Sequence, residues 1–147
     1  MVALGSDHGG YKLKEEIKKY FDENEIKYID FGPDSEDKVD YPDYASKVAE
    51  SIQKSECAFG ILICRSGLGM SIAANKYKGI RCTPIMDEVQ AKYAKMHNNA
   101  NIIGLGADYM DTNKAINMIK IYMETEFEQR HQIRLDKIAE IENKNMK

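Results

Sequence analysis

The sequence predicts an α/β fold built on a five-stranded, mainly parallel sheet. Short runs of β-branched or apolar residues alternate with longer segments of helical period, which is the pattern of strands joined by helical crossovers. Each run ends near Gly, Asp, Ser or Pro, the residues that mark turns. The chain has 147 residues, 43% of them hydrophobic, which is enough for the core of one domain covering residues 1–147.

The elements follow in order along the chain. Strands are expected at residues 2–6, 27–31, 58–64, 79–83 and 101–105. Crossover helices are expected at residues 10–24, 43–54, 66–76 and 87–96, and two further helices at 112–127 and 129–144. The first helix has apolar Leu13 and Ile17 on one face, and the charged last helix has Ile133, Ile138 and Ile141. This last face is predicted to dock on its own domain or on a partner subunit.

Composition favours a small-molecule partner. The net charge of −3 comes from 21 basic and 24 acidic residues, which gives no basic excess for a nucleic acid or a membrane surface. The apolar runs fall short of a membrane-spanning helix, and the first residues do not resemble a secretory signal, so we expect a cytoplasmic protein. The three cysteines, odd in number and without C-x-x-C spacing, predict free thiols rather than disulfides or a zinc site.

Ligands of open parallel sheets collect at the carboxyl ends of the strands. The first strand ends in Asp7-His8 and the third in Cys64-Arg65-Ser66, while His97-Asn98 lies just before the fifth. We expect these residues to converge on one edge of the sheet as acid–base candidates.

A glycine-rich turn, residues 67–71, follows Cys64. Glycines let the backbone approach a ligand closely, and the following helix start presents N–H groups to negative charge, so the turn is a candidate anion hole. It lacks the third glycine of a dinucleotide fingerprint and the sequence of a phosphate loop. A cysteine phosphatase would need an arginine where Met70 stands. Taken alone, such a turn is more often structural.

Cys64 is the candidate base or nucleophile, because it lies where a strand meets a helix start and has Arg65 beside it. Cys57 and Cys82 are interpreted as buried apolar residues. His8 and His97, as isolated residues, could equally be packing histidines. Arg130 and Arg134, four residues apart, could grip a phosphate together or could simply be solvated.

Motifs along nearly the whole chain resemble the ribose-5-phosphate isomerase B family, which also includes galactose- and allose-6-phosphate isomerases. The motifs that carry the resemblance are Ser6-Asp7-His8-Gly9-Gly10, Asp40-Tyr41-Pro42, Ile61-Leu62-Ile63-Cys64 through Ser71-Ile72-Ala73-Ala74-Asn75-Lys76, Gly79-Ile80-Arg81, His97-Asn98-Asn99-Ala100-Asn101 and Arg130-His131. The resemblance implies a three-layer, Rossmann-like α/β/α sandwich and a homodimer with active sites at the subunit interface. It implies no metal and no organic cofactor.

The resemblance also implies roles for individual residues. Cys64 would be the base that moves a proton between C2 and C1 through a cis-enediolate, and His97 with Ser66 would open the sugar ring. The charge of the enediolate would be met by the backbone N–H groups of Gly67, Leu68, Gly69, Met70 and Ser71. Substrate contacts would come from Asp7, Tyr41, Asn98, His8, Arg130 and Arg134. His97 and Asn98 would reach in from the second subunit, and Met70 disfavours the branch of the family that uses a glutamate base.

Three departures from the family pattern bear on specificity. Arg65 replaces a small residue after the cysteine, Asp108 stands where many relatives carry a phosphate-binding arginine, and Glu128-Gln129 replaces a glycine pair. We hypothesise that Arg65 partly compensates for the missing arginine. The main prediction is interconversion of ribose 5-phosphate and ribulose 5-phosphate. The alternatives are another sugar phosphate (galactose 6-phosphate, allose 6-phosphate or a tetrose phosphate), a catalytically silent sugar-phosphate binder, or a subunit that needs a different homologous partner. The choice between dimer and tetramer stays open.

Overall fold

The protein is built on a five-stranded parallel sheet with the strand order β2-β1-β3-β5-β4. The computed structural model describes residues 1–146; Lys147, the last residue of the expected domain, lies outside them. The strands are β1 (Val2–Ser6), β2 (Tyr28–Asp30), β3 (Phe59–Cys64), β4 (Cys82–Pro84) and β5 (Ile102–Gly106). Every neighbouring pair is parallel, which confirms the predicted sheet.

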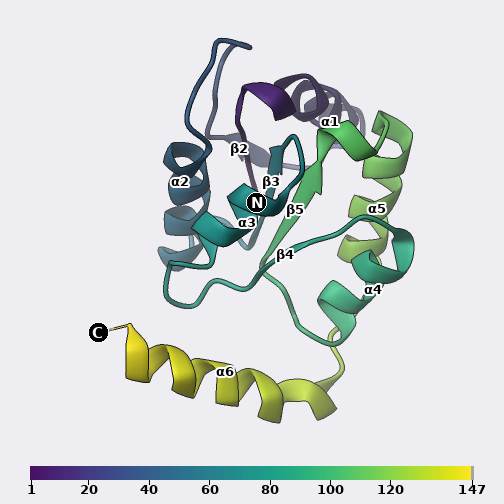
Figure 1. Cartoon of the computed structure of the whole chain (residues 1–147). Helices are drawn as coiled ribbons and strands as arrows, with labels where there is room; N and C mark the ends of the chain where they lie inside the picture. The colour runs from purple at the N-terminus through teal and green to yellow at the C-terminus, as the bar shows by residue number, and fades with distance from the viewer. Residues whose placement is uncertain (147) are drawn as a thin grey trace.

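Helices cover both faces of the sheet, which confirms the three-layer α/β/α arrangement (Figure 1). The helices are α1 (Tyr11–Glu23), α2 (Tyr41–Gln53), α3 (Leu68–Ala74), α4 (Glu88–Met96), α5 (Thr112–Glu124) and α6 (Gln132–Asn145). One apolar core joins the sheet to α1, α4 and α5, and a second joins it to α2 and α3. The strands are therefore apolar on both faces, as their continuous apolar runs require.

The register of the central strands sets where the site can lie. Ser6 of β1 pairs with Ile63, and Cys64 at the end of β3 pairs with Gly106 at the end of β5. The carboxyl ends of these three strands are therefore level. Whatever follows each strand meets at the same edge of the sheet.

Three predicted elements differ from the structure by three residues at one end. The helix expected at 112–127 ends at Glu124. The fourth strand was expected at residues 79–83 but spans Cys82–Pro84, because Ile80 N–H closes a turn onto the carbonyl of Tyr77 and Gly79 has a left-handed φ of 83°. The predicted last helix, 129–144, is a 3-10 turn (Gln129–His131) followed by α6.

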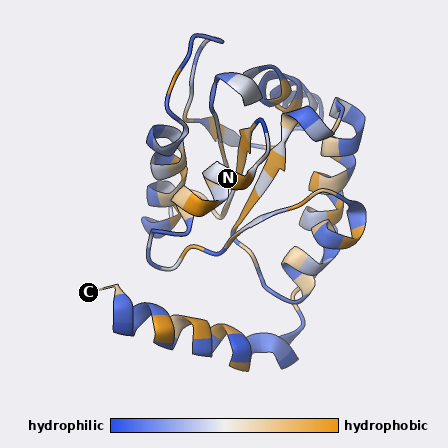
Figure 2. Ribbon diagram, in the orientation of Figure 1, coloured by the Kyte–Doolittle hydropathy of each residue, from blue (hydrophilic) through white to orange (hydrophobic). Residues whose placement is uncertain are grey.

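Helix α6 runs apart from the sheet and its covering helices (Figure 1), and apolar residues lie along its length (Figure 2). Leu135 is buried, but Ile133, Ile138 and Ile141 are 61%, 44% and 62% exposed. A cavity of about 440 Å³ lies between α6 and the β4 edge, and Glu142 accepts a hydrogen bond from Gly79 N–H across it at 2.8 Å. This cavity is at α6 and not at the predicted reaction site around Cys64.

Candidate active site

Cys64 is the last residue of β3, and its side chain is only 5% exposed. Its Sγ accepts a hydrogen bond from the backbone N–H of Gly67 at 3.1 Å. Gly67 has a φ of 80°, a left-handed conformation that glycine adopts without the steric penalty of other residues. The chain can therefore reverse directly after the strand and aim an N–H at the sulfur. A negatively charged sulfur accepts such a bond more strongly than a neutral thiol.

The predicted anion hole is narrower than the five residues expected. The N–H of Gly67 is bound to Cys64, that of Leu68 to the hydroxyl of Ser66 at 3.2 Å, and that of Ser71 to the carbonyl of Gly67. Among the hydrogen bonds of residues 1–146, none uses the N–H of Gly69 or Met70. These two N–H groups, at the start of α3, are therefore free to donate hydrogen bonds to an anion.

Tyr41 lies over this turn from the start of α2, where its side chain is 40% exposed. A Cβ added to Gly69 would come within 2.7 Å of the Tyr41 ring carbon Cζ. The absence of a side chain at Gly69 thus lets the phenol approach the candidate anion hole.

Asp7 and His8 follow β1 at the same edge of the sheet. Asp7 is 7% exposed, and its carboxylate accepts the N–H of Gly10 at 3.0 Å, so it caps the turn that begins at His8. Nδ1 of His8 accepts a hydrogen bond from Val39 N–H at 3.2 Å. In the neutral imidazole, that bond assigns the proton to Nε2, which can donate it to a ligand.

Arg65 and Asp108, the two charged residues that depart from the family pattern, form an ion pair with each other. Arg65 Nε lies 3.3 Å from the Asp108 carboxylate, and the two side chains are 71% and 52% exposed. The backbone N–H of Asp108 also donates to the carbonyl of Arg65 at 3.0 Å. A Cβ on Gly9 would lie 2.4 Å from Arg65 Cγ, so the arginine stem passes close to the turn after β1.

The expectation that His97 and Asn98 share an edge with Cys64 is wrong for a single chain. His97 caps the carboxyl end of α4, before β5 begins at Ile102, so it lies at the amino edge of the sheet. Five strand residues at about 3.3 Å each separate the two edges by roughly 16 Å. In a parallel sheet, a residue that precedes one strand and a residue that follows the neighbouring strand lie at opposite edges of the sheet.

Arg130 and Arg134 also lie away from His8, beside His97. Arg130 pairs with Glu128 at 3.2 Å, and Nη1 of Arg134 lies 3.3 Å from Nδ1 of His131. They do not share one helix, since Arg130 belongs to the 3-10 turn before α6. One chain therefore holds the predicted site as two halves, with Asp7, His8, Tyr41 and residues 64–71 at the carboxyl edge.

Sequence reasoning assigned no role to His131, which lies at the centre of the second half. Its ring is tilted against that of His97 with centroids 4.6 Å apart, and His97 stacks on Tyr93 at 4.3 Å. Burial lowers the pKa of His131, and the nearby cations Arg130 and Arg134 lower it further. The only sequence feature that pointed to His131 was its position next to Arg130 in the Arg130-His131 motif. A motif does not show which side chains are in contact.

Comparison with known proteins decides the family. Residues 2–138 match the ribose/galactose isomerase family. The chain belongs to this family. Ribose-5-phosphate isomerase B of Escherichia coli is 37% identical over 144 residues, which cover 97% of each chain. A Bacillus subtilis protein, 48% identical over 147 residues and 99% of each chain, is named only provisionally, as a sugar phosphate isomerase.

Solved structures of the family share the fold. Ribose-5-phosphate isomerase B of Clostridium thermocellum is 43% identical, covers 97% of each chain and has a TM-score of 0.95. The Mycoplasma genitalium enzyme, solved with bound ribulose-5-phosphate, is 34% identical with a TM-score of 0.91, over 97% of this chain and 95% of that one. The protein is thus a sugar phosphate isomerase of this family. Within residues 1–146, no helix has the length and apolarity to cross a membrane.

Proposed function

We propose that the protein interconverts ribose 5-phosphate and ribulose 5-phosphate, with Cys64 as the base. The names of the relatives supply the substrate. The observation that carries the chemistry is the contact of Cys64 Sγ with Gly67 N–H at 3.1 Å, directly beside the unused N–H groups of Gly69 and Met70. A base and an anion site are what a proton transfer next to a carbonyl needs.

The reaction begins with the open-chain aldose, whose C1 carbonyl oxygen accepts N–H groups of the turn. The Cys64 thiolate takes the proton from C2, and the electrons of that C–H bond form the C1–C2 double bond of a cis-enediolate. A proton passes from O2 to O1, the thiol returns its proton to C1, and C2 becomes the ketone carbonyl. The N–H groups of Gly69 and Met70 stabilise the negative charge only while it exists, which lowers the barrier.

The remaining roles require a second copy of the chain. His97 and Asn98 lie at the amino edge of their own sheet, so they serve the Cys64 of the other protomer in a homodimer. His97 then moves the ring-opening proton together with Ser66, and Asn98 contacts the enediolate. Arg130 and Arg134 bring two cations to the phosphate that His8 contacts from the first protomer, while Asp7 and Tyr41 contact sugar hydroxyls. The whole chain, residues 1–147, acts as one domain without a cofactor.

Another sugar phosphate is the second candidate substrate, because the ion pair of Arg65 and Asp108 lies beside Cys64. Because Arg65 pairs with Asp108, it is not free to bind the phosphate in place of the arginine that relatives carry at position 108. If the pair selects the substrate, Arg65→Gly changes the KM for ribose 5-phosphate relative to those for four- and six-carbon sugar phosphates. Equal KM values in the variant and the parent for every sugar phosphate would show that the ion pair does not contribute to substrate specificity.

The test of the proposed reaction is conversion of ribose 5-phosphate by the purified protein and by Cys64→Ala. We expect Cys64→Ala to lower kcat about 10³-fold or more, as loss of a proton-transfer group does, with KM little changed. The matched control is Cys57→Ala, another buried free cysteine, which should keep its turnover. Full activity in Cys64→Ala would exclude the thiol as the base. Absence of turnover on any sugar phosphate would favour a silent binder or a missing partner chain.

A further inference from the structure

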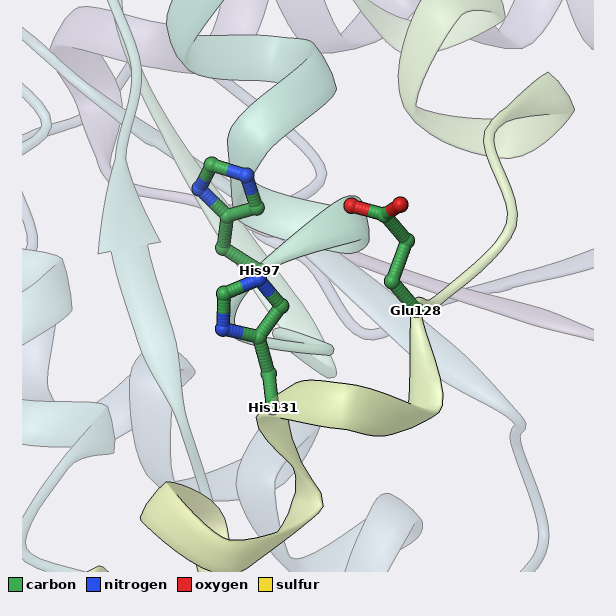
Figure 3. A group of neighbouring side chains, drawn as sticks. All are labelled: His97, Glu128 and His131. Carbon is green, nitrogen blue, oxygen red and sulfur yellow. The ribbon is translucent and has the colours of Figure 1, made fainter.

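A group of three metal-ligating side chains lies at the amino edge of the sheet. It consists of His97, from the end of α4, and Glu128 and His131, from the segment that leads into α6. One ligand atom from each residue lies within 4.8 Å of the others. Figure 3 shows the two imidazole rings next to each other and the carboxylate of Glu128 on the same side of the segment.

His131 brings an unsatisfied polar atom to this group. Its side chain is 91% buried, and its Nε2 has no hydrogen-bond partner among residues 1–146. A buried ring nitrogen without a hydrogen-bond partner costs free energy, and a bound water or ion is one explanation for such an atom. This atom is independent evidence that the group of three binds something.

The geometry points to a divalent transition-metal site, and we propose that His97, His131 and Glu128 bind Zn²⁺ with a water molecule in the fourth position. Two imidazoles and a carboxylate are a ligand set that zinc takes in open, four-coordinate sites. Around zinc, ligand atoms at about 2.1 Å stand roughly 3.4 Å apart. The ligand atoms therefore need to approach one another by up to about 1.4 Å, which rotation of the partly exposed His97 and Glu128 side chains allows.

Arg134 competes with the metal for His131, whereas Arg130 does not block Glu128. Arg134 approaches Nδ1 of His131 at 3.3 Å, and because a guanidinium only donates, this contact favours a proton on Nε2. Metal binding through Nε2 needs the other tautomer, so Arg134, which is exposed, has to move away. Arg130 binds Oε1 of Glu128 and leaves the second carboxylate oxygen for the metal.

The site makes zinc an inhibitor rather than a cofactor. Zinc bound to a ring nitrogen of His97 removes the lone pair that ring opening uses, so bound zinc lowers turnover. This consequence rests on the proposed isomerase function. The metal site itself rests only on residues of one chain, so binding and activity are measured separately.

The experiment is titration of the chelator-treated protein with Co²⁺ in the absence of sugar, followed by displacement with Zn²⁺. Four-coordinate cobalt gives strong visible absorption, and aqueous six-coordinate cobalt does not. We expect this absorption in the parent protein, and an affinity at least about tenfold weaker in Glu128→Gln and in His131→Gln. Glu126→Gln, an exposed carboxylate two residues from Glu128, is the matched control and should bind as the parent does. Arg134→Gln should bind more tightly, because the competitor for His131 is gone.

Several results would overturn the site. These are the absence of visible absorption, equal affinity in Glu128→Gln and the parent, unchanged or weaker affinity in Arg134→Gln, or a thiolate-to-cobalt charge-transfer band that disappears in Cys64→Ser. Because Glu128 is on the surface, its variant tests the site even if His131→Gln misfolds. Inhibition of turnover by Zn²⁺ that Glu128→Gln relieves would add the regulatory role. Zinc bound without inhibition would contradict that role and leave the site intact.

Discussion

At Gly67 the chain takes the conformation on which the candidate base depends. The sequence already indicated a tight turn after Cys64, from the glycines and the start of a helix. It could not indicate which N–H groups remain free, because Ser66 and Cys64 occupy two of them through side-chain contacts. The free pair, Gly69 and Met70, emerges only when each backbone donor is assigned to an acceptor.

Gly67→Ala tests the turn at the scale of one residue. A left-handed φ costs a residue with a Cβ about 1–2 kcal/mol, and this Cβ would also lie 3.0 Å from the carbonyl carbon of Leu105. We expect a loss of about 2 kcal/mol in the free energy of unfolding and a loss of turnover, since the N–H donated to Cys64 moves. Urea unfolding and steady-state kinetics measure the two.

The control for this substitution is Gly79→Ala, which has a nearly equal φ of 83° but no atom within 4 Å of the added Cβ. It should lose only the backbone contribution, about 1 kcal/mol, and keep its turnover. Equal kinetics in the two variants would mean that the position of the Gly67 N–H does not matter for catalysis.

At the scale of elements, hydrophobic periodicity located the sheet and helices well. Strands β1, β2, β3 and β5 begin and end within one residue of the prediction. The fourth strand is displaced because the turn around Gly79 uses residues that look apolar and extended in the sequence. A charged residue inside a core also escaped prediction: Lys14, on the buried face of α1, is fully buried.

Lys14 is held by Asp30 at the end of β2. Its Nζ donates to both carboxylate oxygens, at 2.7 and 2.8 Å, and to the carbonyl of Pro33 at 3.0 Å. Asp30→Asn leaves the buried ammonium with only the partly exposed Glu15, at 3.5 Å, as counter-charge, so we expect a loss of about 3 kcal/mol in the free energy of unfolding at neutral pH. Glu36→Gln, in the exposed pair with Lys12, should change it by less than about 1 kcal/mol. A small effect of Asp30→Asn would show that the pair contributes little.

The pair also makes stability depend on pH. Burial alone would raise the pKa of Asp30, but hydrogen bonds from Lys14 and Lys18 and from Gly32 N–H outweigh it, and the pKa is lowered. The stabilisation is therefore complete above the unfolded-state pKa of about 3.9 and is lost as pH falls through the lower folded-state value. The difference in unfolding free energy between the parent and Asp30→Asn should be constant from about pH 5 to 8 and shrink in acid. A difference that grows on acidification would contradict this.

At the scale of the whole molecule, the two halves of the predicted site lie at opposite edges of one sheet. This separation could be read from the sequence, because His97 precedes a parallel strand whereas Cys64 ends one. The motifs shared with the family do not show which copy of the chain supplies which residue to a site. Helix α6, with three exposed isoleucines, is the surface that we expect a second copy to cover.

Mixing two inactive variants, Cys64→Ala and His97→Ala, tests the shared site most directly. After exchange of subunits, half of the dimers contain one protomer of each kind, and in each of these one site has both Cys64 and His97. We predict recovery of about a quarter of the parent's turnover of ribose 5-phosphate. If the mixture stays as inactive as its components while subunit exchange is verified, Cys64 and His97 do not act across a dimer.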